Sequence, residues 1–188
     1  VINKGLIRSE RGLSVENRGD SLVTVTNEGD LIAGEELRFG SREQRLGTVQ
    51  NKGLIVSEKS GLEVYATELD NSGGMGSETE MSIELKESFV NRSGAGVRAT
   101  GNLSIVAEKM ETVESSWIES MAEFNIRVNN LDNYGDLVSL GPLYLQSAGD
   151  VINKGLIRSE RGLSVENRGD SLVKVTNEGE FIAGEELR

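Results

Sequence analysis

The feature of this chain that most restricts its fold is a long internal repeat. Residues 1–38 return at 151–188, and the two copies differ only at Thr24/Lys174, Asp30/Glu180 and Leu31/Phe181. An independent domain does not end by starting again, so we expect a window on a longer tandem array. The chain is then one repeat segment, with a 150-residue super-repeat at 1–150 and the start of a second copy at 151–188. We expect the residues after Arg188 to continue close to FGSREQRLGT.

A shorter period lies inside the super-repeat. Each unit begins with Asn-x-Gly or a close variant, as in VINKGLI, VTNEGDL and LDNYGDL. The asparagines of this motif are Asn3, Asn27, Asn51, Asn71, Asn91, Asn133, Asn153 and Asn177. If Glu114 fills the place between Asn91 and Asn133, the chain has about nine units of 19–24 residues. Asparagine and glycine both tolerate left-handed backbone, so we expect a turn here, with the asparagine amides hydrogen-bonded in a structural ladder.

The residues after each asparagine alternate between inward and outward positions. After Asn71, for example, the predicted inward positions are Met75, Ser77, Met81 and Ile83. Alternation predicts short strands, and each unit is too small to bury its own apolar face, so the units must stack on one another. We therefore predict an all-β fold, a parallel β-helix (solenoid) that grows by about 4.8 Å per coil. One predicted inward position is small in every unit, at Ser9, Ala33, Ser57, Ser77, Ala99, Ser120, Ser139, Ser159 and Ala183.

The segment KMETVESSWIESMAEF allows a second interpretation. Its apolar residues at 110, 113, 117, 121 and 124 have helical spacing. The β interpretation instead places Ile118, Ser120, Phe124 and Ile126 inside and Trp117 outside. We prefer strands, because the register carries through and a helix would interrupt the stack.

Composition argues against several functions. The formal net charge is −11 and there is no basic stripe, which disfavours nucleic acid and anionic membranes as partners. No apolar run is long enough for membrane insertion, and the chain has neither cysteine nor histidine. NEGDLIAGEE gathers carboxylates near a turn but matches no calcium motif. We therefore predict a chain that is not an enzyme and uses no metal or cofactor. Scattered acidic residues include Glu35, Glu36, Asp70, Asp132 and Asp136, and the aromatic candidates for glycan contact, Trp117, Tyr65, Tyr134 and Tyr144, do not share a coil position.

Several coils resemble a known repeat family. LDNSGG, LDNYGDLVSLGPLYLQSAGD and VINKGLIRSERGLSVEN are similar to the repeats of filamentous haemagglutinin proteins. That family comprises exoproteins of two-partner secretion, both large adhesins and contact-dependent growth-inhibition proteins. The resemblance covers essentially the whole chain and is weakest at 105–128. It implies a right-handed β-helical fibre that is exported unfolded through an outer-membrane transporter partner and folds at the bacterial cell surface.

The stretch VENRGDSLV, at 15–23 and 165–173, contains a tripeptide that resembles integrin ligands. Nine residues link Val15 to Val25, whereas five residues make this link in a 20-residue coil. Insertions in stacked repeats bulge outward, so we expect the tripeptide at the tip of a loop. An ordinary polar turn is the alternative, because the next coil has an equally long link, GSREQRLGT, without the motif. The candidate adhesion residues are Arg18, Gly19, Asp20, Arg168, Gly169 and Asp170.

These observations favour a structural role. We expect a shaft segment of a secreted fibre, a monomeric rod that presents a distal binding or toxic element to a host-cell receptor or a neighbouring cell. Two alternatives stay open: integrin-type adhesion through the Arg-Gly-Asp loop, and a β-helical protein that binds or degrades polysaccharide.

Overall fold

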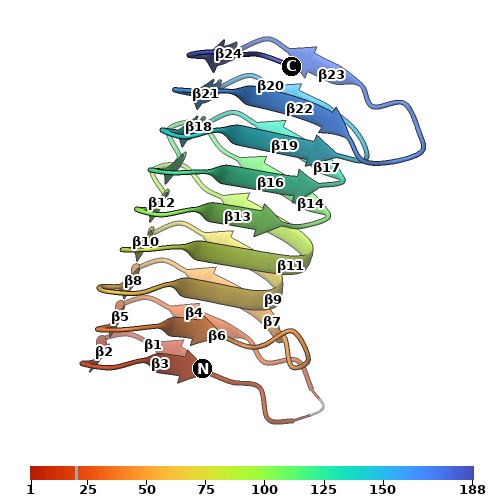
Figure 1. The fold of residues 1–188 in the computed structure, drawn as a ribbon. Helices are drawn as coiled ribbons and strands as arrows, with labels where there is room; N and C mark the ends of the chain where they lie inside the picture. Colours follow the sequence, from red (N-terminus) through yellow and green to blue (C-terminus); the bar gives the residue numbers. More distant parts are fainter. Residues whose placement is uncertain (20) are drawn as a thin grey trace.

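The computed structural model describes residues 1–19 and 21–188, which form one stack of nine coils (Figure 1). All strand pairings between coils are parallel, and the described residues contain no helix. The predicted all-β parallel β-helix of about nine coils is therefore confirmed. No helix that could cross a membrane is found in this part of the chain.

Each coil contributes one strand to a nine-stranded sheet and one or two strands to a 15-stranded sheet that covers the rest of the wall. The nine-stranded sheet consists of β2 (Leu6–Ser9), β5 (Asp30–Ala33), β8 (Leu54–Ser57), β10 (Gly74–Ser77), β12 (Gly96–Ala99), β15 (Trp117–Ser120), β18 (Asp136–Ser139), β21 (Leu156–Ser159) and β24 (Glu180–Ala183).

The 15-stranded sheet has two columns. The column that leads into the Asn-x-Gly turns consists of β1 (Ile2–Asn3), β4 (Val25–Asn27), β7 (Leu46–Asn51), β14 (Lys109–Thr112), β17 (Asn130–Asn133), β20 (Val151–Asn153) and β23 (Val175–Asn177). The other column consists of β3 (Leu13–Val15), β6 (Leu37–Phe39), β13 (Leu103–Val106), β16 (Phe124–Val128), β19 (Leu143–Ser147) and β22 (Leu163–Asn167). Two long strands, β9 (Leu62–Asn71) and β11 (Met81–Asn91), run through both columns.

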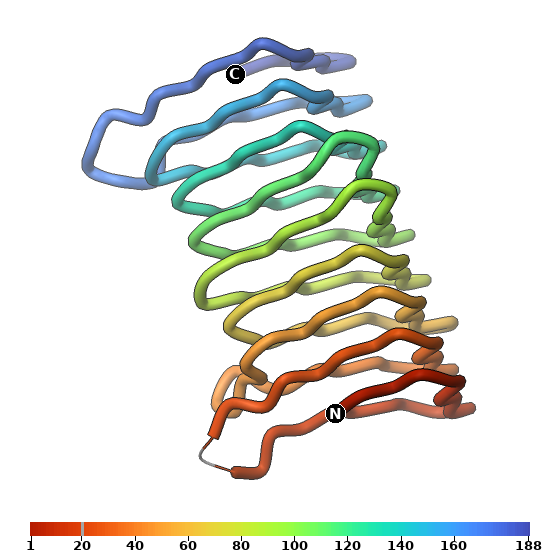
Figure 2. Tube along the Cα trace, turned by 180° about the vertical axis from the view of Figure 1, so that it is seen from behind, coloured from red at the N-terminus to blue at the C-terminus, as the bar shows by residue number. Residues whose placement is uncertain are grey.

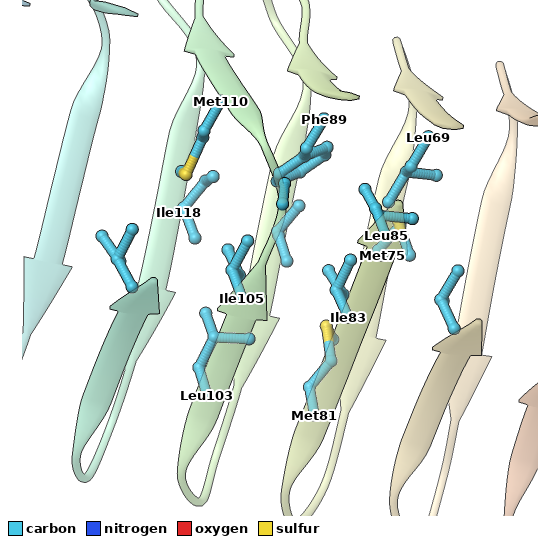
Figure 3. Close-up of a cluster of buried hydrophobic side chains, with 14 of the residues drawn as sticks. Leu69, Met75, Met81, Ile83, Leu85, Phe89, Leu103, Ile105, Met110 and Ile118 are labelled. Atoms are coloured by element: carbon cyan, nitrogen blue, oxygen red, sulfur yellow. The ribbon is translucent and has the colours of Figure 1, made fainter. Parts of the chain in front are cut away.

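The core is a narrow apolar column inside the coils. Side chains from successive coils stack in rows, as Figure 3 shows for Met81 beside Leu103 and Ile83 beside Ile105. The bulkiest buried groups are Phe39, Phe89 and Phe124, which are fully inaccessible. The small residues also stack in register, from Ser9 to Ala183, as the alternation predicts. Shape and register thus follow from period-two patterning.

The segment at 105–128 is built of strands, as we prefer above. Ile118, Ser120 and Phe124 are fully buried, and β15 pairs with β12 and β18 in the common register. Trp117 points outward with 41% of its surface exposed. A helix would have turned Trp117 to the same face as Phe124, so the exposed tryptophan excludes the helical alternative.

The expected position of Glu114 in the asparagine row is wrong. Thr112 occupies that place: it pairs with Asn91 on one side and Asn133 on the other, and Glu114 is exposed. The turns after Asn91 and Thr112 are each two residues longer than the turn after Asn71. These turns include Gly94 and Ser115, whose φ angles are 76° and 65°. The extra residues lie in these two turns, so the coil from Asn91 to Thr112 and the coil from Thr112 to Asn133 have the same length.

The expected reason for the glycines is also wrong. In the described residues, neither the ladder asparagines nor the glycines two positions after them have positive φ. Glycine is required instead by the close approach of successive backbones. A Cβ atom added at Gly53 would lie 2.0 Å from the carbonyl oxygen of Gly29. The turn therefore has room for backbone only.

A conservative core change tests the packing. Ile105→Val removes one buried methylene from a fully inaccessible side chain, so we expect a loss of about 0.5–1.5 kcal/mol in the free energy of unfolding, measured by urea denaturation. Ile32 lies at an outward position of β5, and Ile32→Val should change stability by less than about 0.5 kcal/mol. Equal losses in the two variants would contradict the assignment of inward and outward faces.

Candidate functional site

The long loops that contain Arg18-Gly19 and Arg168-Gly169-Asp170 lie at the same corner of the stack (Figure 2). In the first copy, β3 ends at Val15 and β4 begins at Val25. In the second copy, β22 and β23 flank the corresponding loop, which extends well beyond the neighbouring coils (Figure 1). Figure 2 shows that the described parts of both loops lie outside the coil interior.

An asparagine holds the base of the loop in each copy. The Asn17 side chain accepts a hydrogen bond from the Gly19 amide (3.2 Å) and donates to the Ser21 carbonyl (3.1 Å). Asn167 makes the equivalent bonds with Gly169 and Ser171, each 2.8 Å long. The loop is thus closed by a local turn, as expected where asparagine competes for backbone groups. Asp20 lies outside the described residues.

The two arginines of the motif differ in their surroundings. Arg18 is strongly exposed and lies 3.0 Å from the Glu16 carboxylate. Arg168 instead lies against the preceding coils, where it donates to the Val128 carbonyl (3.1 Å) and to the Asn129 side chain (2.5 Å). Asp170 is exposed. The two arginines are therefore held by different partners, and the contact of Arg168 with residues 39 and 40 positions earlier could not be read from the sequence.

The next long loop, at 40–45 between β6 and β7, has an anchor that sequence reasoning missed. Arg45 donates to the Glu84 carbonyl (2.6 Å), forms an ion pair with the Glu84 carboxylate and lies over the ring of Tyr65. Arg42 contacts the same carboxylate at 3.1 Å. Arg45 is largely buried, with 14% of its side chain exposed. Arg42 and Arg45 therefore fix this loop to the outer wall of the solenoid. A long loop at this corner can thus contribute to stability without binding a ligand.

Several acidic side chains form ion pairs with lysine or arginine residues of neighbouring coils. Asp70 lies 2.5 Å from Arg92 and Asp132 lies 3.0 Å from Lys109, where the hydrogen bond raises the pKa of Lys109. Glu28 lies between two lysines, and its hydrogen bond to Lys52 lowers the pKa of Glu28. Of the other carboxylates named above, Glu36 pairs with Arg38, and Glu35 and Asp136 are exposed. Three acidic groups do not converge on a metal position anywhere among the described residues.

The asparagine row is a continuous ladder over most of the stack. Each amide donates to the next asparagine oxygen at 2.7–2.9 Å, from Asn3 to Asn91 and from Asn133 to Asn177. Between these runs Asn91 donates to the Trp117 carbonyl, and the Thr112 hydroxyl donates to Asn133. Buried amides that would otherwise lack partners are thus satisfied by the neighbouring coil.

These features define a segment of a parallel β-solenoid. Its asparagine ladder and several ion pairs connect each coil to the next. Over 133 residues, or 71% of its length, the chain is 23% identical to the protein named tRNA nuclease CdiA from Yersinia mollaretii. The chain spans about 4% of the length of that relative. No family model matches the chain, and no solved structure matches it. The chain is thus a solenoid segment that is distantly related to a small part of a very large protein.

Proposed function

We propose that this chain is a non-catalytic segment of the shaft of a large secreted bacterial surface protein. The distant similarity to a nuclease of far greater length and the haemagglutinin-like coils support this role. In such a protein the shaft holds a distal binding or toxic element away from the cell. An outer-membrane transporter would export it, and a receptor on a host or neighbouring cell would be its target.

The observation that carries this proposal is the seamless junction between the two copies. β20, the first strand of the second copy, pairs with β17 in register, and Asn133 donates to Asn153 at 2.7 Å. Seven coils after Asn3, the chain is therefore back at the same ladder position. A unit that returns to its own starting geometry can be added or removed without disturbing its neighbours. We infer that the 150-residue super-repeat is the building unit of the array.

Deletion of one 150-residue super-repeat from the parent protein tests the shaft role. Seven coils correspond to a length of about 34 Å, so electron microscopy should show a fibre shorter by that amount. Surface display, measured by antibody labelling of intact cells, and the activity of the distal element should persist. Normal display with complete loss of that activity would contradict a shaft and favour direct binding by this segment.

Integrin-type adhesion is the second candidate, favoured by the exposed Arg18 on a projecting loop. The double variant Asp20→Glu and Asp170→Glu keeps the charge but displaces each carboxylate by one methylene. If the loop is a ligand, adhesion of integrin-bearing cells to the immobilised 188-residue chain should fall to background. Adhesion of the Arg168→Ala variant should be compared with that of wild type. In the second copy the Arg168 guanidinium donates to Asn129 and is therefore not free to contact a receptor. Equal adhesion of wild type and double variant would assign the tripeptide to a plain turn.

A further inference from the structure

The outer face of the nine-stranded sheet has a hollow in the middle of the stack. Gly74 and Gly76 of β10 and Gly96 of β12 occupy successive outward positions, where the sheet carries no side chains. Leu54 borders the hollow on one side and Trp117 on the other, because Leu54, Gly74, Gly96 and Trp117 are in register across four coils. The resulting open groove has a volume of about 360 Å³, and its lining is predominantly apolar.

The Trp117 indole packs against the sheet at one side of the groove and does not project into solvent. A Cβ atom added at Gly96 would be 2.2 Å from Cζ2 of the indole, so the six-membered ring covers the Gly96 backbone. The tryptophan is nevertheless 41% exposed. One part of the indole therefore rests on the sheet while another part remains open to solvent, which is the arrangement of a stacking platform.

The groove becomes polar at its other end. A second hollow, of about 700 Å³, shares Val56, Gly76 and Arg98 with the first. Its further lining includes Glu58, Glu78 and Thr100. The two hollows thus form one continuous surface, with an aromatic and glycine-lined end and an end that offers carboxylates, a hydroxyl and a guanidinium.

We propose that this surface binds an uncharged glycan chain, with one sugar ring stacked on Trp117 and the next directed toward Arg98 and Glu78. A pyranose has an apolar face of C–H groups and a rim of hydroxyls, so it complements a surface that changes from apolar to polar within a few residues. Carboxylates accept hydrogen bonds from hydroxyls, and the Arg98 N–H groups donate to them. The glycines let the ring approach the backbone closely.

The negative charge of the chain favours neutral over acidic glycans at this surface. At the polar end Glu58 pairs with Arg8 and Arg98 pairs with Glu119. Glu78 adds a further carboxylate, and the whole chain has a net charge of −11. An acidic polysaccharide would meet the Glu78 carboxylate and would be repelled by the field of the rod. A peptide with bulky side chains would require a deeper cavity than this open groove on a sheet face. A neutral glycan meets neither obstacle.

Trp117 is the single tryptophan of the chain, so its fluorescence reports directly on the proposed site. The 188-residue chain should be titrated with neutral hexose oligosaccharides of β-1,4-glucan, α-1,4-glucan and galactan type, and with a sialylated oligosaccharide of similar length. We expect a saturable change in fluorescence with at least one neutral oligosaccharide and none with the sialylated one.

Gly76→Val supplies the decisive variant, because it fills the groove and leaves Trp117 in place. A Cβ atom at Gly76 would lie 3.5 Å from a methyl group of Val56, an ordinary contact that should leave the fold intact. Binding should weaken at least about tenfold, with an unchanged circular dichroism spectrum and urea midpoint. Val138→Ala, at an outward position of β18 and away from the groove, should bind as wild type.

Three results would overturn the proposal. One is the absence of a saturable response to every neutral oligosaccharide. Another is equal binding by wild type and Gly76→Val. The third is a fluorescence change that depends on protein concentration alone, with dimers in analytical ultracentrifugation, because it would make the groove a contact between two copies. None of these results bears on the shaft role, which depends on the stacking of coils.

Discussion

Gly53→Ala is expected to disrupt the middle of the stack and to cost about 4 kcal/mol or more in the free energy of unfolding. The added methyl group would lie 2.0 Å from the Gly29 carbonyl oxygen and 2.9 Å from its carbonyl carbon. Both obstacles are backbone atoms held by parallel pairing of β5 and β8, so no side chain can rotate away. Relief requires two coils to separate locally, which breaks the hydrogen bonds between them. Urea denaturation followed by circular dichroism measures the loss.

Gly76→Ala is the matched control for this change. Gly53 and Gly76 lie in the same part of the stack, but the Gly76 substitution meets only the Val56 side chain, at 3.5 Å. We expect its stability to remain within about 0.5 kcal/mol of wild type. Hydrogen exchange should show lost protection in Gly53→Ala first in β5 and β8. A similar midpoint for both variants would show that close backbone approach does not explain the glycine row.

Much of this architecture could be predicted from the sequence, because a solenoid expresses the same local rule in every coil. Inward residues such as Met81, Ile83 and Phe124 recur at period two, and an error in one coil is corrected by the register of its neighbours. The fold class and the outward position of Trp117 depend on this rule alone. The parallel strand pairings confirm the fold class, and the exposure of Trp117 confirms its outward position.

The sequence pattern fails to predict the structure where one coil departs from that rule. Thr112 replaces asparagine in the ladder, and its hydroxyl accepts hydrogen bonds from the Tyr134 and Gly135 amides. Nothing in the residue type identified it, because the two extra turn residues shifted the apparent motif to Glu114. The sequence pattern indicates the glycine positions but not the physical reason for them. A turn motif suggests a dihedral preference, whereas close stacking becomes visible only when two coils are placed together.

Surface sites were the least predictable feature, since they combine residues from several coils. The groove beside Trp117 needs Leu54, Gly74 and Gly96 to be in register, and a scan for rows of aromatic residues does not detect a row of absent side chains. Contacts such as Arg168 to Asn129 depend on the direction in which a loop folds. The repeat pattern therefore predicts the strands and core of a solenoid well. It predicts the loops and the surface grooves poorly.

The asparagine ladder leads to the second large effect, which should depend on pH. Asn71 is fully buried and donates to the Asn91 oxygen at 2.8 Å. In Asn71→Asp, a carboxylate oxygen would face that oxygen inside the stack, so we expect a loss of about 3–5 kcal/mol in the free energy of unfolding at pH 7.5.

Burial and the facing oxygen should raise the pKa of the introduced carboxyl above its unfolded value of about 3.9. The folded variant then binds more protons than the unfolded one between these two pKa values, so its stability falls as the pH rises through this interval. At pH 4.5 a protonated carboxyl can donate to Asn91, and the difference from wild type in urea midpoint should shrink. Asn71→Leu, which cannot titrate, should show the same deficit relative to wild type at both pH values. An equal deficit for Asn71→Asp at pH 4.5 and 7.5 would mean that the introduced charge reaches solvent, and hence that the ladder opens more readily than its hydrogen bonds indicate.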